Sequence, residues 1–226
     1  MVATAGPGMY NKRYACQSQF NGTVGEYFRL SILMFLLVVF TLGLGMPWAI
    51  CMLHRWRMNN LVIDGKQVFF CGRGKKLFWR YIGWSILSLL TLGVYAFRIP
   101  VKVMDWLMDH THLGSEDGWK PSNRDFYQSS AFCGVTMDYI RVVILQTILL
   151  IVTLGLAMPW VICMWGKWFF DNMVIDGKQV VFEGRGKKLF WYYLGWCILS
   201  IITLGVWGYW MAVRILKWEA EYTRFA

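Results

Sequence analysis

The chain has 226 residues and a formal net charge of +10, and it is 57% hydrophobic, 18% aromatic and only 16% charged. A soluble domain of ordinary composition is about half apolar and about a quarter charged. The composition therefore argues against an ordinary water-solvated domain and indicates a chain that needs an apolar solvent.

Two stretches of the chain are nearly the same sequence. Residues 61–79 and 173–191 are identical at 16 of 19 positions, at a constant offset of 112 that also holds outside these stretches. A repeat of this length indicates one structural unit used twice. We therefore predict four segments, which are an N-terminal tail (1–13), a first unit (14–113), a linker (114–125) and a second unit (126–226).

Four runs contain neither a charged residue nor a histidine, namely 30–53, 81–97, 142–166 and 189–213, of 24, 17, 25 and 25 residues. A helix that crosses a bilayer needs about 20 apolar residues, with a range of about 17–25. We therefore expect four transmembrane helices, two in each unit.

A Thr-Leu-Gly element interrupts each run, and Met-Pro-Trp follows it in the first run of each unit. Proline removes a backbone donor, so these helices should kink. In lipid the freed carbonyl must be satisfied nearby, and a threonine hydroxyl is a candidate donor. The residues expected at kinks and helix-packing surfaces are Thr41, Gly43, Pro47, Thr91, Gly93, Thr153, Gly155, Pro159, Thr203 and Gly205.

A polar hairpin lies between the two apolar runs of each unit. Asp64-Gly65 and Asp176-Gly177 each separate two extended, β-branched segments. Asp-Gly in this setting favours a two-residue type I′ turn, in which both residues have positive φ. One face of the ribbon is apolar, so it must rest on lipid, on the other hairpin or on a neighbouring subunit.

Directly after each hairpin comes Gly-Arg-Gly-Lys-Lys-Leu-Phe-Trp, at 72–79 and 184–191. The spacing is not that of a phosphate-binding loop. Basic residues at a membrane surface attract anionic lipid by about 1 kcal/mol each, and tryptophan favours the headgroup level. We predict a collar that contacts lipid headgroups, or alternatively a plain anchor without lipid selectivity. The predicted headgroup residues are Arg73, Lys75, Lys76, Trp79, Arg185, Lys187, Lys188 and Trp191.

If every run spans, both hairpins lie on one side of the membrane, and their density of basic residues places them in the cytoplasm. The expected fold is a mainly α, polytopic membrane protein of two parallel tandem repeats. Each repeat has two long kinked transmembrane helices joined by a short β-hairpin, with amphipathic tail helices near 98–113 and 215–222. In a second geometry, the runs dip into the membrane and return at their Thr-Leu-Gly breaks, which keeps most loops on one face.

The residues that enzymes need are scarce. The chain has three histidines (His54, His110 and His112) and no Cys-x-x-Cys pair. We interpret His110 and His112 as solvated loop residues, because the second unit has Tyr222 and Arg224 at those positions. No catalytic residue, cofactor or metal site is predicted.

The order of these motifs resembles the YjgN-like family of bacterial inner-membrane proteins, whose function is not established. The resemblance covers 14–112 and 126–224, and Thr-Leu-Gly followed by Pro-Trp is its most specific part. His110-Thr111 matches a His-Thr element of the family, although the second unit has Tyr222-Thr223. The resemblance implies residence in the bacterial inner membrane, and it supplies no reaction or substrate.

The runs lack the ionisable groups that ion-coupled transporters carry within the membrane. We therefore expect a non-enzymatic integral membrane protein that self-associates and binds or shapes the bilayer through its basic and aromatic collars. The alternative is an oligomeric passive channel or small-molecule transporter. The expected partners are membrane lipids, chiefly anionic ones, and further copies of the chain, with no nucleic acid.

Overall fold

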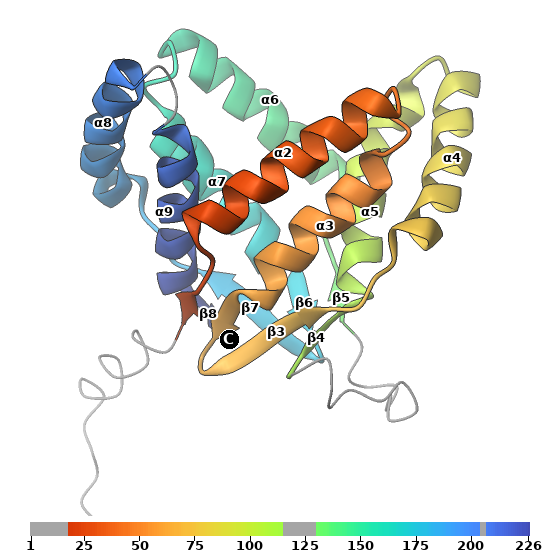
Figure 1. The fold of residues 1–226 in the computed structure, drawn as a ribbon, viewed down its shortest axis with the longest axis horizontal. Helices are drawn as coiled ribbons and strands as arrows, with labels where there is room; N and C mark the ends of the chain where they lie inside the picture. The colour runs from red at the N-terminus through yellow and green to blue at the C-terminus, as the bar shows by residue number, and fades with distance from the viewer. Residues whose placement is uncertain (1–17, 115–129, 204–206) are drawn as a thin grey trace, which may run out of the picture.

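The computed structural model describes residues 18–114, 130–203 and 207–226. The predicted N-terminal tail (1–13) and Gly205 lie outside these residues, as does all of the predicted linker except Gly114. Each half of the chain has the same order of strands and α-helices: a short strand, two helices, a β-hairpin, two further α-helices and a closing strand (Figure 1).

The elements of the two halves correspond, except that the 3₁₀ segment of the first half has no counterpart among the described elements of the second. The first half contains β1 (Gln19–Phe20), α2 (Val24–Phe40), α3 (Met46–Asn59), β2 (Leu61–Ile63), β3 (Lys66–Phe70), α4 (Gly74–Leu90), the 3₁₀ segment η1 (Val94–Arg98), α5 (Ile99–Met108) and β4 (Thr111–Leu113). The second half contains β5 (Ala131–Phe132), α6 (Thr136–Val152), α7 (Met158–Asp171), β6 (Met173–Ile175), β7 (Lys178–Phe182), α8 (Gly186–Ile202), α9 (Gly208–Glu221) and β8 (Thr223–Phe225).

Each half forms an antiparallel four-stranded sheet, in the order β1-β2-β3-β4 or β5-β6-β7-β8. In the first hairpin Ile63 pairs with Lys66, which is the register that the Asp-Gly pattern predicts. Asp64 and Gly65 have φ of 47° and 73°, and the second hairpin repeats these signs. Because both residues of a type I′ turn need positive φ, the turn follows from the two residue types.

The outer strands of each sheet differ from the sequence expectation. The segment near 98–113 was expected to be one amphipathic helix, but α5 ends at Met108 and residues Thr111–Leu113 form β4. The Thr111 hydroxyl donates to the Leu107 carbonyl and so caps the end of the helix. β4 then pairs with β3 and covers an edge that would otherwise expose unpaired backbone groups.

The prediction of a polytopic membrane fold with long kinked helices is wrong. Each apolar run is divided between two helical segments, which reverse direction at Thr-Leu-Gly in the three runs where this element is described, and the longest of these helices has 17 residues. Among the described residues, no helix is long and apolar enough to cross a membrane. The prediction of a multi-pass protein of the bacterial inner membrane with cytoplasmic hairpins is therefore wrong as well.

The reversals gather at one end of the molecule. In Figure 1 the turns between paired helices lie along the upper edge, and the sheets lie at the lower edge. The closing strand β8 pairs with β7, so the end of the second unit lies on the same side as its hairpin. Each run thus leaves the sheet layer and returns to it.

The apolar face of each hairpin rests on helices of both units, which are α3 and α9 for the first hairpin and α7 and α5 for the second. Ile63 and Val68 are fully buried, as are Met58 of α3 and Met108 of α5. His54 of α3 is buried in the same core, where its Nε2 lies 3.2 Å from the Thr111 hydroxyl. The hairpin therefore needs neither lipid nor a partner subunit to cover its apolar face.

We predict that His54 makes folding sensitive to pH. Burial, assisted by the nearby Arg57 cation, lowers the pKa of His54 from 6.5 to about 3. Between these values the unfolded chain binds a proton that the folded protein excludes, so stability falls as pH decreases from about 6.5 toward 3. Chemical denaturation of the wild type and of His54→Leu in detergent micelles should show a shallower pH dependence for the variant. Equal slopes would contradict this account.

Candidate functional site

The turn at Thr41 satisfies its own backbone. The Thr41 hydroxyl donates to the Leu37 carbonyl at 2.6 Å and accepts the N–H of Gly45 at 2.7 Å, so it caps the end of α2 and the start of α3 together. The N–H groups of Leu42 and Gly43 return to Val39 and Val38, the pattern of a Schellman motif. Each N–H from Thr41 to Met46 has an acceptor within the turn and its two helices.

The same hydrogen bonds recur in the other turns. The Thr91 hydroxyl accepts the N–H of Tyr95, and the Thr153 hydroxyl accepts the N–H of Ala157. The Thr203 hydroxyl donates to Leu199 and accepts from Trp207 across the α8–α9 connection. The threonines predicted at kinks therefore lie in turns between separate helices, with Pro47 and Pro159 at the start of the returning helices.

A leucine occupies the most exposed position of each fully described turn. Leu42, Leu92 and Leu154 have φ of 49° to 51°, and their exposed fractions are 92%, 95% and 93%. Turns in water favour glycine or asparagine at such positions, because other side chains strain the backbone by about 1–2 kcal/mol. A leucine that is both strained and almost fully exposed therefore recurs in all three fully described turns.

The helices that lead to these turns are apolar outside. α2 has no buried residue, and α6 has only one, Gln146. The amide of Gln146 donates to the Val161 carbonyl inside the molecule, whereas Ile144, Leu145 and Ile148 on the same helix are exposed. Toward the turn, α6 thus directs its amide inward and these apolar side chains outward, which is the reverse of a helix that packs its apolar stripe on a protein core.

The predicted collar residues lie at the opposite ends of the helices from the turns. Arg73, Lys75 and Lys76 are exposed at the start of α4, and their counterparts Arg185, Lys187 and Lys188 are exposed at the start of α8. Trp79 and Trp191 are exposed one turn further along these helices. The collar residues therefore lie at the base of two separate helices, α4 and α8.

Packing explains the glycines of the Gly-Arg-Gly element. A Cβ at Gly72 would lie 2.2 Å from the ring of Phe70, and one at Gly74 would lie 2.6 Å from the ring of Trp48. Gly184 and Gly186 meet Phe182 and Trp160 in the same way. The glycines therefore allow the backbone to pass close to aromatic rings, and the basic residues of the element face outward.

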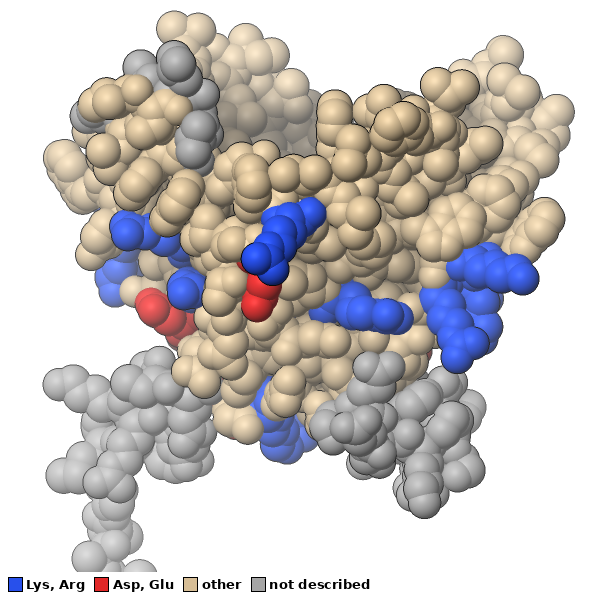
Figure 2. Space-filling model, in the orientation of Figure 1, with Lys and Arg blue, Asp and Glu red and all other residues tan. Residues whose placement is uncertain are grey.

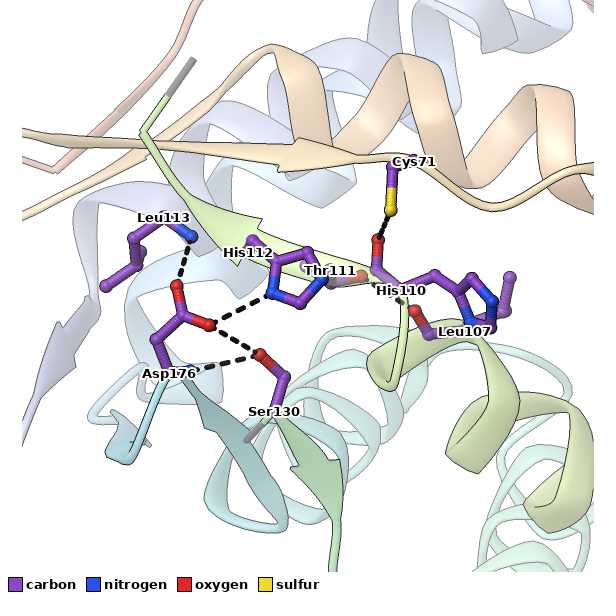
Figure 3. A network of polar contacts seen from close by, with 8 residues as sticks. All are labelled: Cys71, Leu107, His110, Thr111, His112, Leu113, Ser130 and Asp176. Carbon is purple, nitrogen blue, oxygen red and sulfur yellow. Dashed lines mark hydrogen bonds and ion pairs between the residues drawn. The ribbon is translucent and has the colours of Figure 1, made fainter. Parts of the chain in front are cut away.

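The aspartates of the two hairpin turns join the units. Asp176 accepts the Leu113 N–H at 2.7 Å and lies 3.0 Å from Nδ1 of His112, and the Ser130 hydroxyl completes the network (Figure 3). Since an ionised carboxylate only accepts, His112 Nδ1 carries the proton. Asp64 reciprocates by accepting the N–H of Phe225 at 2.8 Å. Each turn thus binds the closing strand of the other unit.

An ion pair and an apolar cavity lie between the units. Arg57 of α3 binds Glu219 of α9 at 2.8 Å, and burial raises the pKa of Glu219 while Arg57 opposes the shift. Both residues of this pair line a cavity of about 420 Å³, which has Gln146 as a further polar group and mainly apolar walls from α2, α3, α7 and α9. Neither residue of the ion pair was singled out from the sequence.

The sequence also misjudged the histidines. His112 is buried in β4 and contacts Asp176, so it is not a solvated loop residue. One feature of the sequence indicates the burial of His112, because this residue lies in a short segment that could pair with the hairpin. Among the described residues, no group of three or more His, Cys, Asp or Glu side chains is placed to hold a metal ion.

The fold and its surface define a duplicated α+β protein with two sheets at one end and helical turns at the other. The model of the family described as "Bacterial protein of unknown function (DUF898)" matches residues 15–79 and 127–198. The match covers more than half of the chain, which therefore belongs to this family, and the resemblance to the YjgN-like family is confirmed. No curated protein and no solved structure matches the chain.

We predict that Asp176→Asn destabilises the protein by about 1–3 kcal/mol at pH 7, because the carboxylate accepts several hydrogen bonds between the units. Burial would raise the pKa of Asp176, but the hydrogen bonds from His112 and Leu113 hold it below its ordinary value. This contribution is present above the ordinary pKa of an aspartate and is lost as pH falls through the lowered one. Denaturation in detergent at pH 7 and pH 3 should show the difference shrinking in acid.

Asp64→Asn is the matched control. Asn tolerates positive φ as Asp does, so both variants keep the turn. Asp64 accepts the Phe225 N–H. The residue equivalent to His112 is Arg224, which binds Glu183 and not Asp64. Asp64→Asn should therefore cost less. Equal losses in the two variants at both pH values would contradict a special role for Asp176.

Proposed function

We propose that this protein attaches to a lipid bilayer from one side, by inserting its helical turns into the near leaflet. Its role is then that of a non-enzymatic membrane-binding protein. The observation that carries the proposal is the exposed leucine at positive φ in each described turn, in a backbone whose N–H groups need no water. In hydrocarbon every backbone polar group must be satisfied internally, which these turns achieve.

The length of the charge-free arms fits one leaflet. Thr91 lies eleven positions after Arg80, and Thr41 and Thr153 lie twelve positions after Arg29 and Arg141. At 1.5 Å per residue these arms measure about 17–18 Å. The hydrocarbon core is about 30 Å thick, so its half is about 15 Å. A slightly tilted arm therefore reaches the midplane while its basic residue stays at the headgroups.

The free energy of burial is large enough to hold the protein on a membrane. Full burial of a leucine is worth about 1.5–3 kcal/mol, so Leu42, Leu92 and Leu154 together contribute about 5–9 kcal/mol. Association costs roughly 4–15 kcal/mol in lost freedom. The exposed side chains beside the leucines, such as Phe40 and Leu89, add further burial. Insertion of all turns together is therefore favourable, whereas a single turn would bind weakly.

The charge distribution supports the same orientation. Figure 2 shows Lys and Arg gathered in a band across the middle of the molecule, with a surface free of charged groups above it over the helical turns. A band of basic residues beneath an apolar end is the arrangement expected of a protein that lies on a membrane. Each basic residue near an anionic surface adds about 1 kcal/mol.

We predict that the triple variant Leu42→Asn, Leu92→Asn and Leu154→Asn loses membrane binding without losing its fold. Asparagine tolerates positive φ, so the thermal transition in detergent should be unchanged or higher. Partition onto neutral phosphatidylcholine vesicles, measured by flotation, should fall by at least about 100-fold, since about 2.7 kcal/mol or more of burial is lost.

The control is Val135→Asn with Met137→Asn, two exposed apolar residues at the end of α6 remote from the turn. It should float like the wild type. Unchanged flotation of the triple variant would overturn the proposal. The proposal would also fail if the triple variant dissociated an oligomer in sedimentation while its flotation stayed normal, because the apolar face would then be a contact between copies of the chain.

A further inference from the structure

A groove between α8 and α9 combines cations with aromatic rings. Its volume is about 590 Å³, and its walls come from both helices. The basic residues are Lys188 near the start of α8 and Arg214 and Lys217 on α9, which are three residues apart and so share a helix face. The remaining lining residues are Trp191, Tyr192, Trp196, Trp218, Glu221 and Tyr222.

The three cations in this groove are not neutralised by acidic partners. Within residues 18–114, 130–203 and 207–226, no ion pair involves Lys188, Arg214 or Lys217. Aromatic rings hold two of them instead: Lys188 Nζ lies 5.4 Å from the ring centre of Tyr222, and the Arg214 guanidinium lies 5.9 Å from that of Trp207. With one carboxylate, Glu221, the groove carries a formal charge of +2.

The groove lies at the depth where the proposed membrane surface begins. Trp191 lies twelve positions before Thr203, and Lys188 lies fifteen positions before it. Along a helix these separations are about 18 Å and about 22 Å. These distances exceed the half-thickness of the hydrocarbon core, about 15 Å. With the turns inserted, Trp191 is at the headgroup level and Lys188 is just outside it.

The first unit lacks the same charge. At an offset of 112, Lys76 and Lys102 match Lys188 and Arg214, but Asp105 stands where the second unit has Lys217. The two collars are therefore not equivalent, although their Gly-Arg-Gly-Lys-Lys sequences are identical. A general attraction to anionic lipid would need no difference in charge between the units. A site for one discrete anion in the second unit would need this difference.

We propose that the groove between α8 and α9 binds the phosphate group of an anionic lipid headgroup. Arg214 offers a planar fork of N–H donors that matches phosphate oxygens, and Lys188 and Lys217 add point charges on either side. The aromatic walls contact the glycerol and upper acyl region. This inference rests on the proposed function, because only an inserted protein brings the groove to the headgroups.

The test uses the full chain and flotation with phosphatidylcholine vesicles, with and without phosphatidylglycerol. The site variant is Lys188→Gln with Arg214→Gln, and the control is Lys76→Gln with Lys102→Gln, which removes the same charge at equivalent positions. At high salt general attraction is screened, so the preference for anionic vesicles should fall about tenfold in the site variant and less than about threefold in the control. Both variants should bind neutral vesicles like the wild type.

Equal losses in the two variants would overturn the site and leave a general basic collar. A wild type that fails to bind neutral vesicles would instead overturn the proposed function, independently of any difference between the variants. Glycerol 1-phosphate is the soluble probe in isothermal titration. The lipid assignment fails, and the ligand is a soluble phosphate, under two conditions. Glycerol 1-phosphate binds the detergent-solubilised wild type but not the site variant. It also releases no larger a fraction of the protein from anionic vesicles than from neutral vesicles.

Discussion

The fold depends on turns that reverse each long apolar run and pair the backbone N–H groups of the turn within the protein. A turn of four or five residues leaves N–H groups that an aqueous loop would direct to solvent. Here one threonine hydroxyl serves both helices and the Schellman bonds close the rest. The apolar runs can therefore be short helix pairs, and the two sheets at their other ends contain every strand of the described chain.

The sheets join the two units so that all these helix pairs point the same way. Asp64 and Asp176 each lie in a tight turn and bind the closing strand of the other unit. At the base of the helices the junction is thus made of hydrogen bonds from backbone N–H groups to the two aspartate carboxylates. Because it lies on the side opposite the turns, it leaves the apolar ends uncovered by protein. Stability of the fold and exposure of the apolar face are consequences of the same arrangement.

The sequence alone predicted those features of the structure that depend on neighbouring residues. The repeat, the Asp-Gly register and the exposed basic residues after the hairpins follow from neighbouring residues. The reversal at Leu42 was read as a kink because no polar turn residue marks it, and an apolar run of sufficient length is usually one helix. β4 and the Arg57–Glu219 pair depend on contacts between distant segments. Arg214 and Lys217 were accessible through their spacing, but only the structure places them opposite Lys188.

The differences between the units bear on how the apolar ends are held. Arg57 and Glu219 correspond to Phe169 and Leu107 at the 112-residue offset, so the ion pair forms once, between one unit and the other. The Arg57 guanidinium also lies 5.5 Å from the ring centre of Phe169, its own counterpart. Two identical units could not make this contact, because each would present the same group to the other. A buried pair that forms in one relative arrangement favours that arrangement over slipped ones. The proposed one-sided insertion would require such fixed alignment, because turns at different depths could not all reach the same leaflet.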